Sequence, residues 1–374
     1  MMAAPLSGVK VLDFSTLLPG PMATLFLAEA GAEVIKVERP GSGEDMRHYP
    51  PYWGRESINF AMLNRGKKSL AVDLKNPDER ERLRPLIESA DVLVEQFRPG
   101  VMKRLELDYE SVARINPAVI YCSISGFGQT GPKRDRAGHD LNYIGDAGLL
   151  SLSMGTTDTP VIPPALIADI AGGSYPAVLN ILLALRERDR TGKGAYLDIA
   201  MTEGVLPFMY WAIGNGLGAG KWPASGNELV TGGSPRYRLY ATADGRFVAA
   251  GPLEDKFWVA FTETIGLEPQ YRDDSVDPQA TAARVAAIIA THDAAHWEPL
   301  LRKADCCCTI VKSVQEAMQD EHFRQRGLFN AKLVNEQGEA MPATPVPIVP
   351  SLRAHGDDEL AAPALGSHNK DLLD

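Results

Sequence analysis

Short apolar runs alternate with longer amphipathic segments over the first third of the chain. Residues 9–14 and 32–38 predict buried strands, and residues 21–30 between them predict a helix that begins after a Pro-Gly-Pro turn. The same alternation continues further along the chain. Strands are predicted at residues 69–73, 92–97 and 118–125, and a helix is predicted at residues 78–89. Strands that alternate with helices in this way predict an α/β fold with a mainly parallel sheet and helices on both faces.

The pattern changes after residue 172, where apolar positions recur at helical spacing as far as the Gly-rich loop at residues 191–194. A strand and a helix are expected next, at residues 195–200 and 205–213. A hairpin and three helices follow, at residues 237–242 with 246–250, then 255–265, 280–290 and 297–303.

This order of elements predicts two domains. Residues 1–224 form a large domain, and residues 225–330 form a smaller α+β domain. The segment 331–374 is rich in proline, and we expect it to wrap over the large domain and complete it. A chain of 374 residues is long enough for two domains with separate cores.

The charge balance limits the possible partners. The chain has 38 Lys and Arg against 48 Asp and Glu, a formal net charge of −10, so a general nucleic-acid-binding surface is not expected. The N-terminus has no secretory signal, and the apolar stretch 204–220 is interrupted by Pro207 and Asn215, so we expect a cytoplasmic protein that binds no membrane. Any anionic ligand must be held by a local cluster of basic residues.

The four cysteines indicate neither a disulfide framework nor a metal site. Cys122 stands alone, and Cys306, Cys307 and Cys308 are consecutive, a spacing that does not match metal-binding motifs. We interpret them as reduced, mostly structural thiols and expect no bound metal.

The phosphate-binding motifs of nucleotide enzymes are absent. Residues 15–21, after the first predicted strand, lack the G-x-G-x-x-G pattern, and the Gly192-Lys193-Gly194 loop lacks the remainder of a Walker A motif. Glu38 ends a predicted strand, where a ribose-binding acid would lie, but Arg39-Pro40 follows it directly. An NAD-dependent dehydrogenase is therefore a minor alternative.

Two motifs carry the most information about function. Residues 137–143 read Ala-Gly-His-Asp-Leu-Asn-Tyr, and residues 166–173 read Leu-Ile-Ala-Asp-Ile-Ala-Gly-Gly. Together they resemble the class III coenzyme A transferase family (carnitine CoA-transferase or bile-acid-inducible type), which includes the α-methylacyl-CoA racemases. Further matching motifs occur in order along the chain, at residues 17–21, 31–38, 64–68, 97–100, 126–132 and 191–194.

The resemblance implies a Rossmann-like large domain, a small domain joined by two linkers, and two chains threaded through each other as an interlocked homodimer. It implies a coenzyme A thioester as substrate, carboxylic acids as partners in the reaction, and no permanently bound cofactor. The positions that match the CoA-binding residues are Arg39 and Arg98, with Lys67 and Lys68 as further candidates. Each of these residues has the alternative of being an ordinary surface cation.

Asp169 is the first candidate catalytic residue. It lies in an apolar run just before Gly172-Gly173 and a long predicted helix, where the helix dipole is expected to favour the ionised carboxylate. The resemblance implies a nucleophile that forms a mixed anhydride in the transferases and one of two bases in the racemases. The alternative is a structural helix cap.

His139 and Glu254 are the other candidate catalytic residues. Inversion at an α-carbon needs one group to remove the proton and a second to return one to the opposite face, and an imidazole paired with a carboxylate can do this near neutral pH. The resemblance to the racemases implies that His139 is the second base and that Glu254 orients its ring. A structural histidine and a surface acid are the alternatives.

A Gly-rich loop completes the candidate site. Gly232 and Gly233 match a family loop that closes over the active site. Arg236 departs from the residue type usual there, and an arginine near the acyl pocket suits a substrate with a second carboxylate.

Three functions are thus open. A class III CoA transferase that uses Asp169 is slightly favoured, a 2-methylacyl-CoA racemase that uses His139 and Asp169 is the alternative, and a non-catalytic CoA-binding protein is the third.

Overall fold

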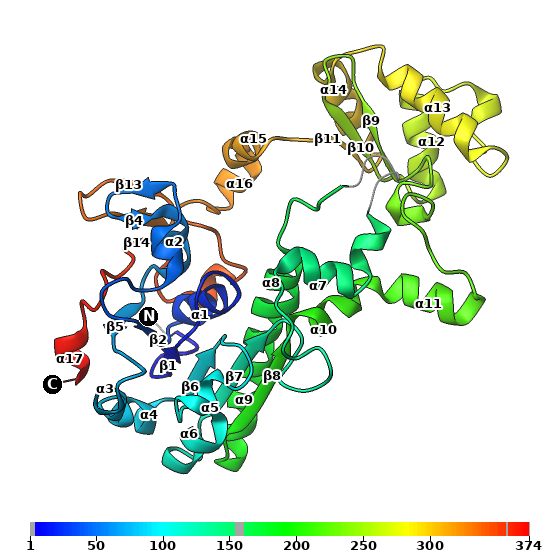
Figure 1. Cartoon of the computed structure of the whole chain (residues 1–374). Coiled ribbons are helices and arrows are strands. Elements are labelled where there is room, and N and C mark those ends of the chain that lie inside the picture. Colours follow the sequence, from blue (N-terminus) through cyan, green and yellow to red (C-terminus); the bar gives the residue numbers. More distant parts are fainter. Residues whose placement is uncertain (1–3, 154–160, 357, 374) are drawn as a thin grey trace. The chain divides into compact units, whose positions relative to one another are not determined.

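The computed structural model describes residues 4–153, 161–356 and 358–373 (Figure 1). The two ends of the predicted large domain, residues 1 and 374, lie outside these ranges. The described residues form two compact units. The first unit takes its residues from Met1–Ala147, Ala165–Phe208 and Glu321–Asp374, and the second from Gly148–Pro164 and Met209–Asp320.

A six-stranded parallel sheet forms the centre of the first unit, in the order β5-β2-β1-β6-β7-β8. Its strands are β1 (Lys10–Asp13), β2 (Glu33–Glu38), β5 (Lys68–Ala71), β6 (Val92–Glu95), β7 (Ile120–Ser125) and β8 (Ala195–Ala200). Four of the six strands, β1, β2, β6 and β7, are buried over most of their length, as is usual for strands in the middle of a parallel sheet. The predicted α/β class with a mainly parallel sheet is confirmed.

Helices cover both faces of this sheet (Figure 1). The helices of the first unit are α1 (Pro19–Glu29), α2 (Ile58–Asn64), α3 (Pro77–Glu81), α4 (Arg84–Ser89), α5 (Val101–Arg104), α6 (Tyr109–Ile115), α7 (Asp140–Asp146), α8 (Ile167–Asp169), α9 (Tyr175–Thr191), α10 (Met201–Val205), α16 (Glu321–Gln325) and α17 (Asn369–Leu373). Apolar residues of α4, α5 and α6 pack on one face of the sheet, and α1 and α9 cover the other. The single helix predicted at residues 78–89 is two helices, because Pro85 has no N–H to donate to the Glu81 carbonyl and is tolerated only in the first turn of a helix.

The second unit is a small antiparallel sheet with helices packed on it. The sheet has the order β11-β10-β9, and the predicted hairpin is confirmed as β9 paired with β10. The elements are β9 (Arg238–Ala241), β10 (Phe247–Ala250), β11 (Cys308–Ile310), α11 (Tyr210–Ala219), α12 (Asp255–Thr264), α13 (Pro278–Ile289), α14 (Ala294–Ala304) and α15 (Val314–Gln319). Trp258, Phe261 and Trp297 fill its separate core.

The unit boundaries differ from the predicted domain boundaries at residues 224 and 330. The helix predicted at residues 205–213 is interrupted at Pro207, and the residues after Phe208, α11 included, group with the second unit. The chain returns to the first unit at Glu321.

The C-terminal segment packs on the first unit. It forms a small sheet of β12 (Lys332–Val334), β13 (Ala340–Pro342) and β14 (Glu359–Leu360). The first unit also contains a two-stranded sheet of β3 (Tyr52–Trp53) and β4 (Glu56–Ser57). Residues 368 and 369 lie along the edge strand β5. The His368 N–H donates to the Ser69 carbonyl at 3.1 Å, and the Asn369 side chain bonds both backbone groups of Ala71, at 2.8 and 2.9 Å.

Candidate active site

Three predicted site residues, Arg98, His139 and Asp169, line one cavity of about 290 Å³ in the first unit. Its walls come from the loops after β1, β6 and β7, together with α7, α8 and the first residue of α10, which follows β8. The cavity therefore lies at the carboxyl ends of parallel strands, beside the point between β1 and β6 where the strand order reverses. This is the usual position of a binding site in an open α/β sheet.

Asp169 is held by an unusually close packing of backbone segments. It ends α8 and leads into a π-helical turn, Ile170–Ser174, which continues as α9. A Cβ on Gly172 would lie 2.4 Å from the Met201 carbonyl oxygen, so this position requires glycine. The residue at the N-cap of α8 is Leu166, and Asp169 makes no capping bond, which argues against the purely structural alternative.

The Asp169 carboxyl has a pKa raised to about 6. Burial is the main cause, because it disfavours the charged form, and the nearby carboxylate of Asp140 adds to it, while His139 has the opposite effect. The Asp140 carboxylate also accepts the backbone N–H of Asp169, with a distance of 3.0 Å between Oδ1 and N. The expectation that the helix dipole would favour the ionised form is thus wrong, because burial and a like charge outweigh it.

His139 lines the same cavity from the start of α7. It is the N-cap residue of α7, where its backbone N–H donates to Asn142 Oδ1 at 3.0 Å and its carbonyl accepts the Asn142 N–H at 2.8 Å. The residue is exposed, so the imidazole is free to meet a ligand while its backbone is fixed. The Tyr143 ring packs directly against Gly126, where an added Cβ would lie 2.4 Å from the ring atom Cε1. The Tyr143 hydroxyl donates a hydrogen bond to the Gly138 carbonyl at 2.5 Å.

The N-terminus of α1 offers few donors for a phosphate. Pro19 and Pro21 have no N–H, and the Gly20 N–H donates to Gln96 Oε1 at 2.9 Å. The structure thus gives a physical reason for the missing dinucleotide motif: the donors that a pyrophosphate would use at this helix are absent or already bonded.

Cations at the rim of the cavity come from two loops. Arg98 follows β6, and Arg134 and Arg136 precede His139; all three are exposed. Sequence reasoning missed Arg134 and Arg136. The signal available was the basic run of residues 133–136, which directly precedes the Ala-Gly-His-Asp motif.

Arg39 is exposed at the end of β2 but does not line this cavity. Its guanidinium bonds the Ser42 hydroxyl at 2.8 Å, the Gly43 carbonyl at 2.6 Å and the Asp45 carboxylate. Its role toward CoA stays a prediction.

The predicted role of Lys67 in CoA binding needs correction because this side chain is buried, whereas the role of Lys68 stays a prediction. The Lys67 ammonium is buried, 3.2 Å from Asp13 Oδ2, and it also donates to Thr24 and Asn64 at 2.7 and 2.8 Å. Lys68 is the first residue of β5 and pairs with Glu33, the first residue of β2, so it lies at the end of the sheet opposite to the cavity. The two cations resemble each other in sequence but neither faces this site.

Replacing these two lysines by methionine should give different effects on stability. Lys67→Met leaves the buried Asp13 carboxylate without one of its two cationic partners, and we expect the free energy of unfolding to fall by about 3 kcal/mol. Lys68→Met removes a half-exposed pair and should change it by less than about 1 kcal/mol. Urea denaturation monitored by fluorescence measures both. Equal midpoints for the two variants would contradict the buried ion pair.

Glu254, Gly232, Gly233 and Arg236 belong to the second unit. Arg236 is already bonded by Asp274 and Asp255, with Nη distances of 2.7 Å to each, and by the Leu253 carbonyl at 3.0 Å. Pairing with a substrate carboxylate would require exchange of these partners. Gly232 has a φ of +95°, which glycine adopts without strain, and Glu254 directly precedes α12. The predicted catalytic and loop roles of these residues stay predictions.

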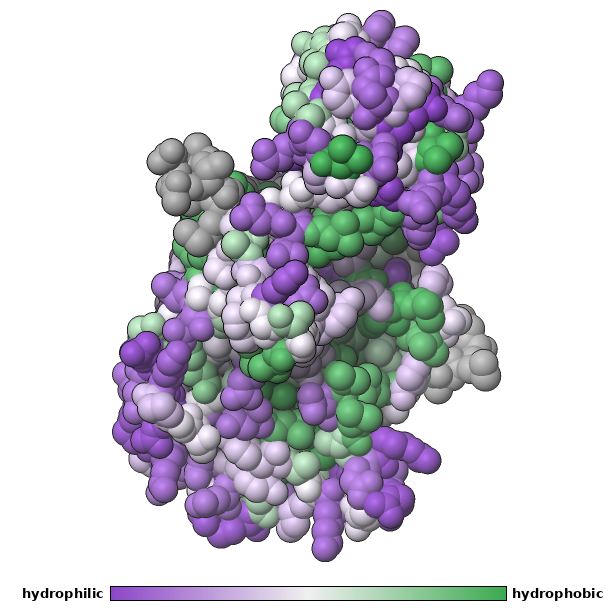
Figure 2. Space-filling view, turned by 90° about the vertical axis from the view of Figure 1, so that its right-hand side faces the viewer, coloured by the Kyte–Doolittle hydropathy of each residue, from purple (hydrophilic) through white to green (hydrophobic). Residues whose placement is uncertain are grey.

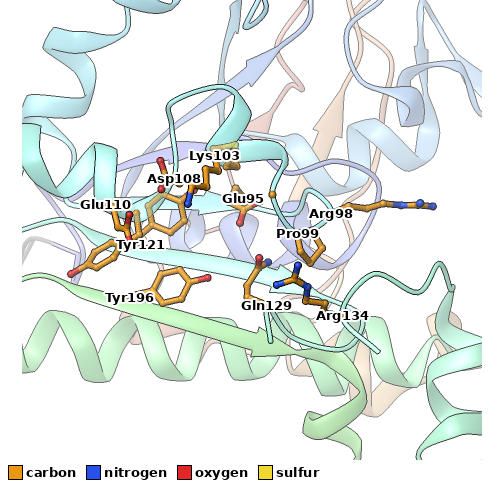
Figure 3. A pocket seen from close by; sticks show the side chains of 13 residues that line it. Glu95, Arg98, Pro99, Lys103, Asp108, Glu110, Tyr121, Gln129, Arg134 and Tyr196 are labelled. Carbon is orange, nitrogen blue, oxygen red and sulfur yellow. The ribbon is translucent and has the colours of Figure 1, made fainter. Parts of the chain in front are cut away.

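A larger cavity of about 480 Å³ adjoins the first and shares Arg98, Pro99 and Arg134 with it. In Figure 3, Arg98 points away from the tyrosine side chains, and Glu95 lies between them and the arginines. Burial raises the pKa of Glu95 to about 7, with Asp198 as a further cause. Neither His139 nor Asp169 lines this cavity, so size alone does not identify the catalytic site.

The pH dependence of turnover tests the electrostatics of Asp169. We expect kcat/KM to rise with pH and level off above a midpoint near 6, because the carboxylate must be ionised to act as nucleophile or base. Asp140→Asn keeps an acceptor for the Asp169 N–H but removes the negative charge, so the midpoint should move to lower pH. Asp146→Asn, on the exposed part of α7, is the control. A midpoint that stays in place in Asp140→Asn would contradict the coupling.

Within the described residues, no group of three or more His, Cys, Asp or Glu side chains has a geometry suited to a metal ion. The side chains of the cavity that can take part in a reaction are one half-buried carboxylate, one exposed imidazole and three arginines. An acidic group held among cations at the end of a parallel sheet is suited to reaction with an anionic acyl carrier.

The chain belongs to CoA-transferase family III, whose family model matches residues 6–369. This family is enzymatic, and its members include CoA transferases and racemases. The family predicted from the sequence motifs is thereby confirmed.

Individual relatives include both activities. The chain is 35% identical to α-methylacyl-CoA racemase of Homo sapiens over 378 residues, which covers 99% of this chain and 92% of the human protein. It is 34% identical to acetyl-CoA:oxalate CoA-transferase of Acetobacter aceti over 92% of this chain and 89% of that protein. The crystal structure of a CAIB/BAIF family protein from Brucella suis superposes with a TM-score of 0.81 at 29% identity, with both chains covered completely.

Proposed function

We propose that this protein transfers coenzyme A between carboxylic acids through a covalent intermediate on Asp169. The observation that carries the proposal is the Asp169 carboxyl in a cavity rimmed by Arg98, Arg134 and Arg136. CoA is polyanionic, and in a chain of net charge −10 its binding requires such a local cluster of cations. The named transferases among the relatives support the same reaction class.

The reaction can be written as a series of balanced acyl exchanges. An Asp169 oxygen attacks the thioester carbonyl, the C–S bond breaks, and CoA thiolate leaves as an acyl-aspartyl anhydride forms. The thiolate then attacks the aspartyl carbonyl and releases the donor acid. The acceptor carboxylate attacks the carbonyl of this aspartyl-CoA thioester, its C–S bond breaks, and CoA thiolate leaves as a second acyl-aspartyl anhydride forms. The thiolate finally attacks the acyl carbonyl of the acceptor, the C–O bond of the anhydride breaks, and the Asp169 carboxylate is freed.

The pKa of Asp169 suits this role. A carboxyl group with a pKa of about 6 is mostly ionised at pH 7 and is a stronger nucleophile and base than an ordinary aspartate. The partial burial that raises the pKa also limits the access of water to an anhydride at Asp169.

A racemase is the second candidate function. His139 and Asp169 line the same cavity, as two bases on opposite faces of an α-carbon would, and the human relative named above is a racemase. In that reaction one group removes the α-proton and the other returns a proton to the opposite face.

An assay with two arms tests the proposal. The protein is incubated with succinyl-CoA, acetyl-CoA or a branched acyl-CoA and an isotopically labelled carboxylic acid, and formation of labelled acyl-CoA is followed by mass spectrometry. In parallel, one enantiomer of a 2-methylacyl-CoA is incubated in deuterated buffer. Labelled thioester supports transfer, whereas α-deuterium with loss of optical purity and no labelled thioester supports racemisation and contradicts the proposal.

We propose further that the protein is a homodimer with interlocked chains. Leu179, Leu182 and Leu183 of α9 are all exposed, the last with 60% of its surface, and the stretch Ile167–Thr191 is apolar enough by composition to cross a membrane. Figure 2 shows hydrophobic residues on the face of the molecule that is turned to the viewer. A second copy of the chain would remove such a surface from water.

Light scattering after gel filtration tests this assembly. We expect a dimer that persists on dilution from micromolar to nanomolar concentration, because threaded chains separate only when they unfold. A monomer at micromolar concentration would exclude it, and a dimer that dissociates on dilution would exclude the interlocking.

Cytoplasmic localisation is also proposed. It is supported by the four free cysteines, of which Cys307 is exposed, because such thiols persist in a reducing compartment.

A further inference from the structure

A cluster of buried charges lies directly beneath the loop after β1. It joins residues of β1, β2 and the segment that follows them, and its members are Asp13, Lys36, Glu38, Glu44, Arg47 and Lys67. The Lys36 side chain is completely buried in the middle of β2, and the Glu44 side chain is 1% exposed. No step of the proposed reaction uses any of these residues.

The cluster holds the backbone of the loop through two charged side chains. Glu44 Oε2 accepts the Leu17 N–H at 2.7 Å, and Lys36 Nζ donates to the Ser15 carbonyl at 2.8 Å. The two side chains also pair with each other, with 3.1 Å between Lys36 Nζ and Glu44 Oε1. The loop has a third bond to the cluster, because Asp13 Oδ1 accepts the Ser15 N–H at 2.9 Å.

These bonds enforce a backbone conformation that leucine avoids. Leu17 has a φ of +61°, in the left-handed region, which is disfavoured for residues with a Cβ. Thr16 and Leu17 line the same cavity as Asp169. The left-handed turn thus determines the shape of the wall that a ligand meets.

A buried ion pair often adds little to the stability of a protein, since replacing it by apolar residues of similar volume is frequently neutral or stabilising. A buried pair that holds a strained turn at the edge of a reactive cavity has a better explanation in ligand positioning. We propose that Glu44, assisted by Lys36, is a positioning residue that keeps Leu17 in its left-handed conformation so that the loop fits the CoA thioester. This inference rests on the proposed use of the cavity for a CoA thioester.

Two matched double variants test the proposal. Lys36→Met with Glu44→Leu removes both charges and the acceptor for the Leu17 N–H. Lys36→Met with Glu44→Gln removes the same charges but keeps an amide oxygen as acceptor. We expect the Leu-containing variant to bind acetyl-CoA about tenfold more weakly, the penalty of an unsupported left-handed residue, and the Gln-containing variant to stay within about twofold. Titration calorimetry measures binding without requiring turnover.

A third variant uses the backbone alone. Leu17→Gly added to the Leu-containing variant should recover most of the lost affinity, because glycine adopts a positive φ without strain. The kcat at saturation should change less than KM in all three variants. Circular dichroism and thermal unfolding verify that each variant is folded. If the Leu-containing variant does not fold, Leu17→Val in the otherwise native chain replaces it. A β-branched residue resists the left-handed region and should weaken binding about tenfold, and Leu17→Gly, which also loses the leucine side chain but adopts a positive φ without strain, should weaken binding less than Leu17→Val.

The outcomes separate the two levels of the argument. If the native protein binds no acetyl-CoA, the use of the cavity for a thioester fails. If the native protein binds and the Leu-containing and Gln-containing variants bind equally, whether at the native level or equally weakly, the positioning role of Glu44 fails while the proposed function stands. Absence of recovery with Leu17→Gly also overturns it.

Discussion

Asp169→Ala should lower turnover by at least about 10⁴-fold while the affinity for CoA stays within a few-fold of the native value. The carboxylate forms the covalent bond in transfer and serves as a base in racemisation, so both reactions lose an essential group. We expect the nucleotide end of CoA to be bound by cations elsewhere on the cavity rim, at Arg98 and its neighbours, which the substitution leaves unchanged. Single-turnover kinetics and calorimetric titration with CoA measure the two quantities.

Two controls accompany this substitution. Asp169→Asn has nearly the same shape but lacks the nucleophilic oxygen, and its loss of turnover should match that of the alanine variant. Asp146→Ala removes an exposed carboxylate of α7 that pairs with Lys133, and it should retain activity. Turnover in Asp169→Asn close to the native value would show that the carboxylate is not the reacting group.

His139→Ala distinguishes the two candidate reactions. In a racemase it removes one of two obligatory bases, so inversion should fall by about 10²–10⁴-fold, although exchange of the α-proton from the face of Asp169 can survive. In a transferase the covalent step belongs to Asp169, so the same substitution should lower turnover only a few-fold. His355→Ala, at an exposed position in the C-terminal segment, is the control and should leave both activities unchanged.

Trapping with hydroxylamine adds a direct chemical test. A transferase incubated with donor thioester should give a hydroxamate at Asp169, which peptide mass spectrometry locates. This adduct together with a mild effect of His139→Ala identifies transfer. Deuterium incorporation with inversion, a large effect of His139→Ala and no adduct identifies racemisation and contradicts the favoured reaction.

The strands and the reacting groups were predictable from sequence because local patterns determine them. Continuous apolar runs identified all six strands of the parallel sheet, and the motif around His139 and the Asp169 run identified two residues that the fold brings into one cavity. Helix ends were less predictable. Pro85 and Pro207 interrupt helices that periodicity alone extends, although the breaking effect of proline could have been applied at both positions.

The environment of single charges was not predictable, because it depends on residues distant in the chain. Lys67 and Lys68 are adjacent and identical in type, yet one ammonium is buried against Asp13 and the other is half exposed. The pKa of Asp169 depends on Asp140, which lies 29 positions earlier and meets it only in the folded chain. Periodicity contains no information about such contacts.

The bonds of residues 368 and 369 to β5 have a consequence for how the protein is made. A strand at the border of a parallel sheet presents unpaired backbone groups on which another chain can build, and here residues 368 and 369 bond to these groups. During synthesis β5 leaves the ribosome roughly three hundred residues before its cover. The nascent chain therefore carries an open sheet border while these roughly three hundred residues are made, and the border closes only after residues 368 and 369 have followed.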